Sequence, residues 1–490
     1  MQAANDLQNW IARLNRRAYA ILVGLSLGII GGLVGLLIAV SDPVIAFGVV
    51  LGLLAGLYVL SNVTAALYGV IAVTALLPFG TFPVKIGITP TLLDLALGAF
   101  LIVYLLQWMT GRRQRIQLTP VHALVGLYAM WLLLSFALGL RYAMPTSAIL
   151  RQFAETLLSI SLTFVLVDLL RDPAALRRLV LVVMVAVGIQ ALVAIGLYLL
   201  PDAAAERTLI RLARIGYPNG GVIRYVEDNP DLAERAIGTW VDPNALGGIL
   251  TVAAAMIAPQ VFASRPVLRW RWLALGVLGL VLLALILTFS RASMLAFAVG
   301  ALFIAFIRYR RFIPVIAVGA LLLLLLPQTQ SYIARFGEAF AGADLATQMR
   351  LGEYSDSLRL IQRYPIFGVG FTGTPEIDIY TDVANMYLIM ANQIGLVGVA
   401  IYLAMIVGVF AYGLYAWRYA KRNPLLDSIH LGYHAALLTG LTNAVADLYF
   451  FRLDFQASVT LFWLLVALAL SSSRLALAQG RNQPLIKRPE

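Results

Sequence analysis

The sequence predicts an all-α, polytopic membrane helix bundle of about 12–14 transmembrane helices, with two long, partly helical loops on the outer face. Of its 490 residues, 61% are hydrophobic and 12% are charged, and the charged share is about half that of an ordinary soluble domain. Stretches such as 18–40, 176–200 and 272–289 are almost free of charge over about 20 residues, the length that crosses the hydrocarbon. Strands of a barrel would alternate apolar and polar residues, so helices are expected.

The apolar runs give the expected spans in chain order. They lie near 18–40, 44–61, 64–79, 91–109, 120–140, 147–169, 176–200, 243–263, 272–289, 293–307, 312–326, 384–415, 428–446 and 455–473. The resulting segments are 1–200 (transmembrane), 201–242 (outer loop), 243–326 (transmembrane, with an outer step at Arg291), 327–383 (large outer loop) and 384–490 (transmembrane, with a cytoplasmic tail). The N-terminal segment lacks a cleavable signal pattern, so the first run is expected to remain as a span.

Basic residues cluster at alternate connections between the runs. The clusters are Arg13/Arg16/Arg17, Arg112/Arg113/Arg115, Arg171/Arg177/Arg178, Arg265/Arg269/Arg271, Arg308/Arg310/Arg311, Arg418/Lys421/Arg422 and Arg474/Arg481/Lys487/Arg488. The positive-inside rule places all of them, and both termini, in the cytoplasm. Topology therefore explains the net charge of +12, and membrane lipids are expected as partners while nucleic acid is not.

Two kinds of chemistry are disfavoured by composition. The chain contains no cysteine, which excludes thiolate chemistry and disulfides. Its three histidines, His122, His430 and His434, make a histidine-built metal site improbable.

The two outer loops carry arginines against the positive-inside trend. These are Arg207, Arg211, Arg214, Arg224, Arg235, Arg335, Arg350, Arg359 and Arg363. Their placement predicts an anionic partner on the outer side. The alternative is that long loops escape the topology rule and that these side chains are simply solvated.

Residues 235–248 (RAIGTWVDPNALGG) mark the return of the first long loop to the membrane. Asp242 is a natural N-cap and Pro243 suits the first helical position, so a helix is expected to begin there. Its N–H groups, with Arg235 and Asn244 beside them, predict a seat for an oxyanion or phosphate. The alternative is an ordinary capped helix whose arginine meets lipid headgroups.

Residues 287–293 (LTFSRAS) form a short polar step between two apolar helices on the outer side. An arginine at this depth is costly unless it faces protein, water or an anion. Arg291 is therefore a candidate for bidentate phosphate binding. The alternative is that its side chain extends to the outer headgroups.

A third polar stretch, 350–370 (RLGEYSDSLRLIQRYPIFGVG), combines a predicted amphipathic helix with a glycine-rich turn. Glu353, Asp356 and Arg359 have the spacing of ion pairs on one helix, which a purely solvated helix would also show. Acidic Glu376, Asp378 and Asp382 follow, just before the next span.

These motifs, in this order and on this side, resemble the O-antigen ligase and O-antigen polymerase superfamily of bacterial membrane glycosyltransferases. The resemblance covers the chain from about Arg235 onward. Residues 288–293 (TFSRAS) resemble its Ser-Arg-Gly-like motif, and Arg350 with 364–370 (YPIFGVG) resembles its Arg and His-Pro-Leu-Gly-x-Gly pattern. Residues 383–388 (VANMYL) and 395–398 (GLVG) resemble its His-Asn-x-Tyr-Leu and Gly-Leu-x-Gly motifs.

The resemblance implies an enzyme of surface polysaccharide biosynthesis in the bacterial inner membrane, with its active face outward. It would transfer a glycan from an undecaprenyl (polyprenyl) diphosphate carrier to a lipid, glycan or protein acceptor, without nucleotide sugar, metal or other cofactor. Arg235 and Arg291 would be catalytic by holding the diphosphate. Arg350, Asn244, Asn385 and Tyr387 would be further substrate-binding residues.

One departure concerns the general base. Ala384 stands where the family usually has a histidine proposed to act on the acceptor hydroxyl. Asp382 is the expected replacement, with Glu376 and Asp378 as alternatives, because a carboxylate near the outer surface can accept a proton. The other interpretation is carrier binding with altered or lost transfer.

Two alternatives of other classes remain open from sequence. A flippase or transporter for lipid-linked oligosaccharides would also use a basic cavity, but the chain shows no convincing internal repeat and its polar residues gather at the outer edge. A non-catalytic accessory subunit of a polysaccharide assembly system would bind partners through the long loops. Ligase and polymerase are not separated.

Overall fold

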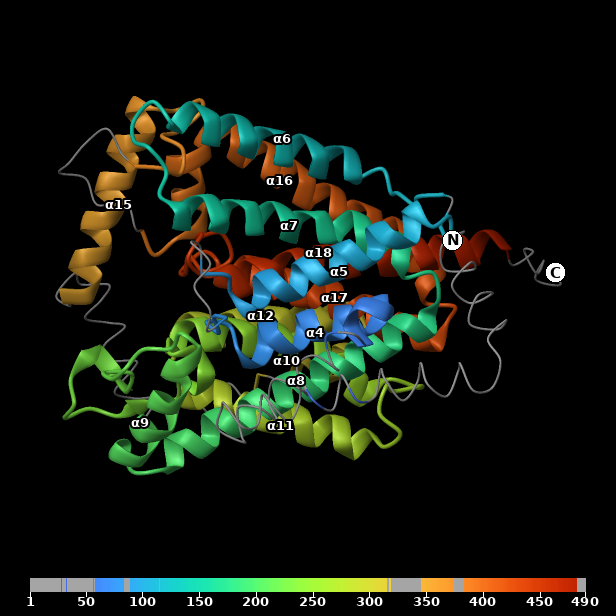
Figure 1. The fold of residues 1–490 in the computed structure, drawn as a ribbon. Coiled ribbons are helices and arrows are strands. Elements are labelled where there is room, and N and C mark those ends of the chain that lie inside the picture. Colours follow the sequence, from blue (N-terminus) through green and yellow to red (C-terminus); the bar gives the residue numbers. More distant parts are fainter. Residues whose placement is uncertain are drawn as a thin grey trace. The chain divides into compact units, whose positions relative to one another are not determined.

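The computed structural model confirms the expected all-α architecture (Figure 1). It describes residues 58–82, 89–113, 115–314, 345–373 and 383–482, with the isolated positions 28, 32, 56, 317 and 318. Within these residues seven helices are long and apolar enough to cross a membrane, and three shorter apolar helices accompany them. The expected spans 18–40, 44–61 and 312–326 lie largely outside the described residues.

The remaining expected spans each correspond to a helix. The α-helices are α4 (Val63–Leu76), α5 (Leu92–Met109), α6 (His122–Gly139), α7 (Ser147–Leu169), α8 (Pro173–Leu199), α9 (Asp202–Ile210), α10 (Pro243–Phe262), α11 (Arg271–Leu287), α12 (Arg291–Ile307), α15 (Leu345–Arg363), α16 (Met386–Ala420), α17 (Pro424–Asn443) and α18 (Gln456–Asn482). Shorter elements are the 3-10 helices η1 (Arg211–Ile215), η2 (Val226–Asp228), η3 (Gly238–Trp240) and η4 (Arg310–Phe312), and the strands β1 (Arg224–Tyr225) and β2 (Glu234–Arg235).

The chain divides into two compact units. One comprises Met1–Gly69 and Gly98–Ile116, and the other comprises Val70–Leu97 and Gln117–Glu490. The boundaries pass through α4 and α5, whereas α6 to α18 all belong to the second unit.

Helices α10 and α18 are the most enclosed spans of the second unit. In each of these two helices 83% of the residues in the most apolar 18-residue stretch are buried, whereas the corresponding share in α6 is 33%. Small residues permit this enclosure of α10: a Cβ on Gly247 would lie 2.7 Å from Ser293 Oγ, and one on Gly432 of α17 would lie 2.7 Å from Met256 O. Close backbone approach is a principal source of helix association in lipid.

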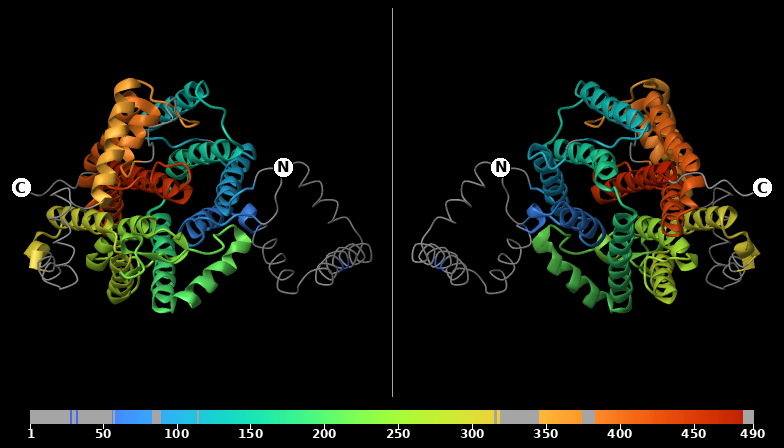
Figure 2. Two further views of the ribbon diagram at one scale, coloured as in Figure 1. Left: turned by 90° about the vertical axis from the view of Figure 1, so that its left-hand side faces the viewer. Right: turned by 90° about the vertical axis from the view of Figure 1, so that its right-hand side faces the viewer.

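Connections between the helices gather at two opposite ends of this unit, which Figure 2 views in turn. At one end, Arg308 after α12 forms an ion pair of 3.1 Å with Asp427 of α17. At the same end Arg177 Nη2 donates to Val267 O at 2.9 Å, joining α8 to the α10–α11 connection. We call this the basic end, because the clusters around Arg177, Arg269, Arg308 and Arg418 lie there.

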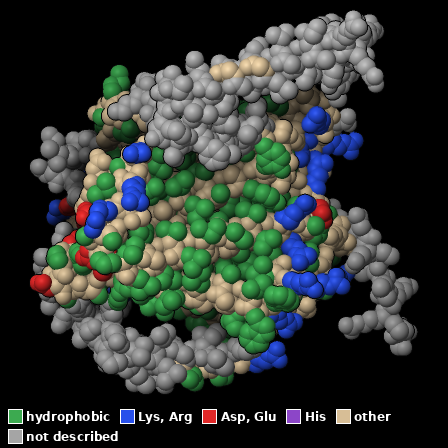
Figure 3. Space-filling model, turned by 60° about the horizontal axis from the view of Figure 1, so that its bottom comes forward, with side chains coloured by type: hydrophobic (Ala, Val, Ile, Leu, Met, Phe, Trp, Pro, Cys, Tyr) green, Lys and Arg blue, Asp and Glu red, His purple; other side chains and the backbone are tan. Residues whose placement is uncertain are grey.

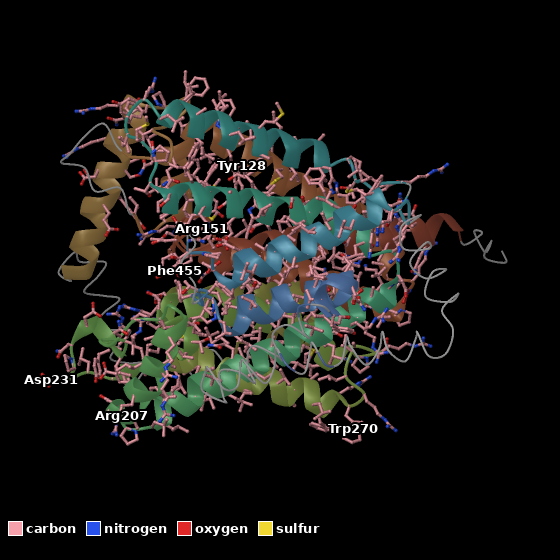
Figure 4. The ribbon with its side chains drawn as sticks, viewed as in Figure 1. Tyr128, Arg151, Arg207, Asp231, Trp270 and Phe455 are labelled. Carbon is pink, nitrogen blue, oxygen red and sulfur yellow. The ribbon has the colours of Figure 1, made fainter. Side chains whose placement is uncertain are left out.

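Surface chemistry follows the same division. Figure 3 shows many lysines and arginines at the basic end, a mixture of basic and acidic side chains at the opposite end, and a hydrophobic belt between the two. Trp270, which is 60% exposed, lies at the basic end, while Arg207 and Asp231 lie at the other end (Figure 4). An exposed tryptophan beside a hydrophobic belt is typical of a membrane–water interface.

The opposite end, here called the loop end, carries the first long loop as ordered structure. Helix α9, η1 and a hairpin of β1 and β2 pack there, with Arg224 opposite Arg235 and Tyr225 opposite Glu234. A small core supports them, formed by Leu197, Ala205, Leu209, Val222 and Ile237. The sequence shows no strand pattern in this loop because each strand is only two residues long.

Helix α16 is broken inside its first half. Gly395 has φ 69° and ψ 173°, which are not helical values. Segment 364–371 fills the break: Val369 N–H donates to Asn392 O at 2.8 Å and Gly370 N–H donates to Gln393 O at 2.9 Å. The two glycine motifs thus form one structural unit in which the backbone groups freed by the break find partners within the protein.

Candidate functional site

Arg235 lies at the centre of a polar cluster at the loop end. Its Nε donates to the Thr288 carbonyl at 2.8 Å, and its Nη2 donates to Asn244 Oδ1 at 2.6 Å. The hairpin is tied to the same turn by Ala236 N–H, which donates to Leu287 O at 2.8 Å. Among the described residues no protein atom accepts from Nη1.

The start of α10 is fully capped. Asp242 Oδ1 accepts from the N–H groups of Asn244 and Ala245, each at 2.8 Å, and Asp242 O accepts from Leu246 N–H at 3.0 Å. Pro243 has no N–H to offer. The predicted N-cap is therefore confirmed, and its side chain accepts from two of the N–H groups that were predicted to face an anion.

Charge around Arg235 is balanced. Burial lowers the pKa of its guanidinium, and the neighbouring Asp242, Tyr449 and Asp447 oppose this shift. Tyr449 lies between α17 and α18, and its hydroxyl donates to Asp242 Oδ1 at 3.0 Å. Burial, with Asp242 and Asp447, raises the pKa of Tyr449, so this phenol keeps its proton. A desolvated cation held in this way is preorganised for an anionic ligand.

A chain of buried polar side chains runs from the α11–α12 turn to α17. Ser293 Oγ contacts Ser290 Oγ at 3.0 Å and donates to Asn443 Oδ1 at 2.9 Å. Asn443 Nδ2 in turn donates to Asp447 Oδ2 at 3.3 Å. Gly247 permits this arrangement, since a Cβ there would lie 3.0 Å from Ser290 Cβ.

Arg291 begins α12 directly after this turn and is half-buried. The backbone of the turn is strained at Phe289, whose φ of 52° is uncommon outside glycine. Val241, which precedes the α10 cap, has φ 60°, a real outlier for a β-branched residue. Both strained residues adjoin groups that hold Arg235, and such strain is typical of functional sites.

Asn385 and Tyr387 fix the start of α16. Asn385 Oδ1 caps the helix by accepting from the N–H groups of Tyr387 and Leu388 at 2.9 and 3.1 Å, and its Nδ2 donates to Val445 O at 2.8 Å. The Tyr387 hydroxyl donates to Leu441 O at 2.9 Å. These bonds give the two predicted substrate-binding residues a positioning role between α16 and α17.

The other predicted residues are placed only in part. Arg350 lies in α15, but its side chain is outside the described part of the structure. Residues Glu376, Asp378 and Asp382 lie outside it altogether. Ala384 lies just before α16, and its N–H donates to Glu353 Oε2 at 3.3 Å. Glu353 was noted in sequence only as a member of an amphipathic helix.

Sequence analysis did not single out Asn443, Asp447 or Tyr449. It also passed over a buried ion group formed by Arg151, which lies 2.8 Å from Asp94 and 3.0 Å from Glu155. Charges inside the run 147–169 were the available signal for this group. Among the described residues no cluster of three or more potential metal ligands is found.

The hairpin next to Arg235 predicts a pH dependence. Burial and then Asp202 raise the pKa of Glu234 from 4.5 to about 7. The fold thus prefers the protonated carboxyl, so this contribution to stability is present below pH 4.5 and is lost as the pH rises towards 7. We expect amide protection over residues 224–235, corrected for intrinsic exchange, to fall between about pH 5 and 7. Glu234→Gln should remove this dependence; an unchanged profile in the variant would contradict the assignment.

Part of the chain matches the model of a known protein family. The family model described as O-antigen ligase matches residues 274–403, which run from α11 through α12 and α15 into α16. The match confirms the resemblance drawn from the motifs and contains Arg291, Arg350, Asn385 and Tyr387. No curated protein matches the chain.

Proposed function

We propose that the protein, whose residues 274–403 match the O-antigen ligase family model, transfers a glycan from a polyprenyl diphosphate carrier to an acceptor. The reaction takes place at the loop end, on the outer face of the bacterial inner membrane. The orientation rests on the basic end facing the cytoplasm by the positive-inside rule.

One observation carries the proposal: Arg235 is held against the turn that leads into Arg291. Its Nε bonds Thr288 O at 2.8 Å, three residues before Arg291, so the hairpin arginine and the start of α12 form one assembly. An arginine bonded to this turn and a second arginine that follows the turn in sequence suit a diphosphate, which carries several acceptor oxygens and gains charge as it leaves.

The roles of the residues follow from this geometry. Arg235 and Arg291 bind the diphosphate, and their charge stabilises the leaving group as the bond to the sugar breaks. Asn244 orients Arg235 directly, and Asp242 supports Asn244 by accepting from its backbone N–H. Tyr449 in turn donates to Asp242. No metal is needed for charge compensation in this scheme, and a chelator tests that point.

The test uses purified protein in lipid nanodiscs with an undecaprenyl-diphosphate-linked oligosaccharide and candidate lipid, glycan and protein acceptors. We expect polyprenyl diphosphate release that survives chelation and falls by about 10²–10³-fold in Arg291→Ala, as for loss of one preorganised donor. Arg207→Ala is the matched control, since this exposed loop arginine bonds only its own helix at Ala203 O among the described residues.

Other outcomes would redirect the assignment. Carrier binding without release, across all acceptors, would favour a flippase or an accessory subunit. Release abolished by the chelator would contradict the metal-independent scheme. Product size separates the remaining pair, because a polymerase extends a carrier-linked glycan whereas a ligase moves a finished chain to a different acceptor.

A further inference from the structure

Glu353 occupies the neighbourhood of the residue at which this chain departs from its family. Its Oε2 accepts from the Ala384 N–H at 3.3 Å. Both groups lie at the loop end, where α15 runs across the ends of the other helices (Figure 1). Among the described residues Glu353 has no ion-pair partner, and the Ala384 N–H is its one hydrogen bond.

Packing fixes the direction in which Glu353 points. Ser357 is fully buried and donates to Asn392 Oδ1 of α16 at 3.0 Å, and Leu360 is also fully buried. Positions 353, 357 and 360 share one face of a helix, so this face of α15 is held on the first turns of α16. Asp356 lies about one turn further along the helix, and its Oδ1 pairs with the exposed Arg359 at 3.3 Å.

The start of α16 belongs to the Arg235 cluster. Asn385, next to Ala384, bonds Val445 O, and Met386 N–H lies 3.0 Å from Asp447 O. Asp447 is one of the groups whose charge acts on Arg235. Glu353 is therefore bonded to the segment whose next residues contact Asp447, and the charge of Asp447 acts on Arg235.

We propose that Glu353 is the proton acceptor of the transfer reaction, in place of a histidine at position 384. The inference rests on the proposed function. The acceptor hydroxyl oxygen forms a bond to the anomeric carbon, and its proton passes to the Glu353 carboxylate. The bond between the anomeric carbon and the diphosphate breaks, and the electron pair leaves on the diphosphate oxygen beside Arg235 and Arg291.

Glu353→Gln tests the proposal, because the amide oxygen can still accept from Ala384 N–H while the side chain no longer takes a proton. We expect the transfer rate to fall by about 10²–10⁴-fold with unchanged carrier affinity, which is the range for losing a general base. Asp356→Asn, on the same helix, should keep the rate of the unchanged protein.

A second variant provides a signature that a structural role would not give. Adding Ala384→His to Glu353→Gln should restore part of the rate, with the acid limb of the pH–rate profile near pH 6.5, about the pKa of an imidazole. A Glu353→Gln protein that transfers at the normal rate, or that fails through weaker carrier binding, overturns the inference and leaves the proposed function standing. Absence of transfer by the unchanged protein with every acceptor overturns both.

Discussion

Arg235→Ala is expected to reduce glycan transfer by about 10²–10³-fold, the usual cost of removing one preorganised donor to developing negative charge. The guanidinium holds the α11–α12 turn through Thr288 O and, in the proposed scheme, also binds the diphosphate. Loss of carrier affinity should accompany the loss of rate. Initial rates and carrier binding in nanodiscs measure both.

Two variants sharpen this result. Arg224→Ala is the matched control, because Arg224 faces Arg235 across the hairpin but is exposed, and its transfer rate should stay within about twofold of normal. Arg235→Lys retains the charge but cannot span Thr288 O and Asn244 Oδ1 together, so it should recover only a small part of the rate. Equal loss in Arg224→Ala and Arg235→Ala would show that hairpin folding, not the guanidinium, is being measured.

Local signals predicted where helices begin. Asp242 followed by Pro243 was expected to cap a helix, and α10 begins at Pro243 with Asp242 bonded to its first turn. Arg291 was expected at a step between two apolar helices, and α12 begins at that residue. Such signals act within one turn of the chain, so a single sequence contains them.

Long-range pairings were not visible in the same way. Tyr449 reaches Asp242 across 207 positions, and Asn443 reaches Ser293 across 150. Each of these side chains is unremarkable in its own segment, because a polar residue after an apolar run is also what a solvated connection shows. Glu353 was missed as a base candidate for a related reason. Its helical spacing with Asp356 and Arg359 is also that of a solvated helix face, and only the packing of α15 against the start of α16 shows that Glu353 faces the protein.

The glycine motifs show the limit of local reasoning most directly. Residues 364–370 were predicted to contain a glycine-rich turn, and residues 395–398, inside the predicted span 384–415, were singled out only as a motif that resembles the same family. In the structure they meet: Leu396 N–H donates to Pro365 O at 2.7 Å, and Ser135 Oγ of α6 donates to Gln393 O at 2.7 Å. The motif therefore supports α16 and leads directly out of α15, the helix that carries Glu353.

Gly395→Ala should be the most destabilising single substitution in this region. A Cβ at Gly395 would lie 2.1 Å from Ile366 O and 2.7 Å from Phe367 N, and its φ of 69° disfavours any residue with a side chain. The contacts are backbone atoms of a segment inserted into α16, so no rotamer change relieves them. Backbone strain and overpacking each cost about 1–3 kcal/mol, so the free energy of unfolding should fall by about 3 kcal/mol or more.

The thermal unfolding midpoint of the detergent-solubilised protein measures this effect, with Gly276→Ala as the matched control. Gly276 lies in α11, and a Cβ there meets nothing within 4 Å. The unfolding midpoint of the Gly276→Ala protein should therefore be unchanged or slightly raised. If both variants unfolded alike, segment 364–371 would not be held in the α16 break. If Gly395→Ala folds but α15 loosens, transfer should fall with it, because α16 then no longer holds Glu353 beside Ala384.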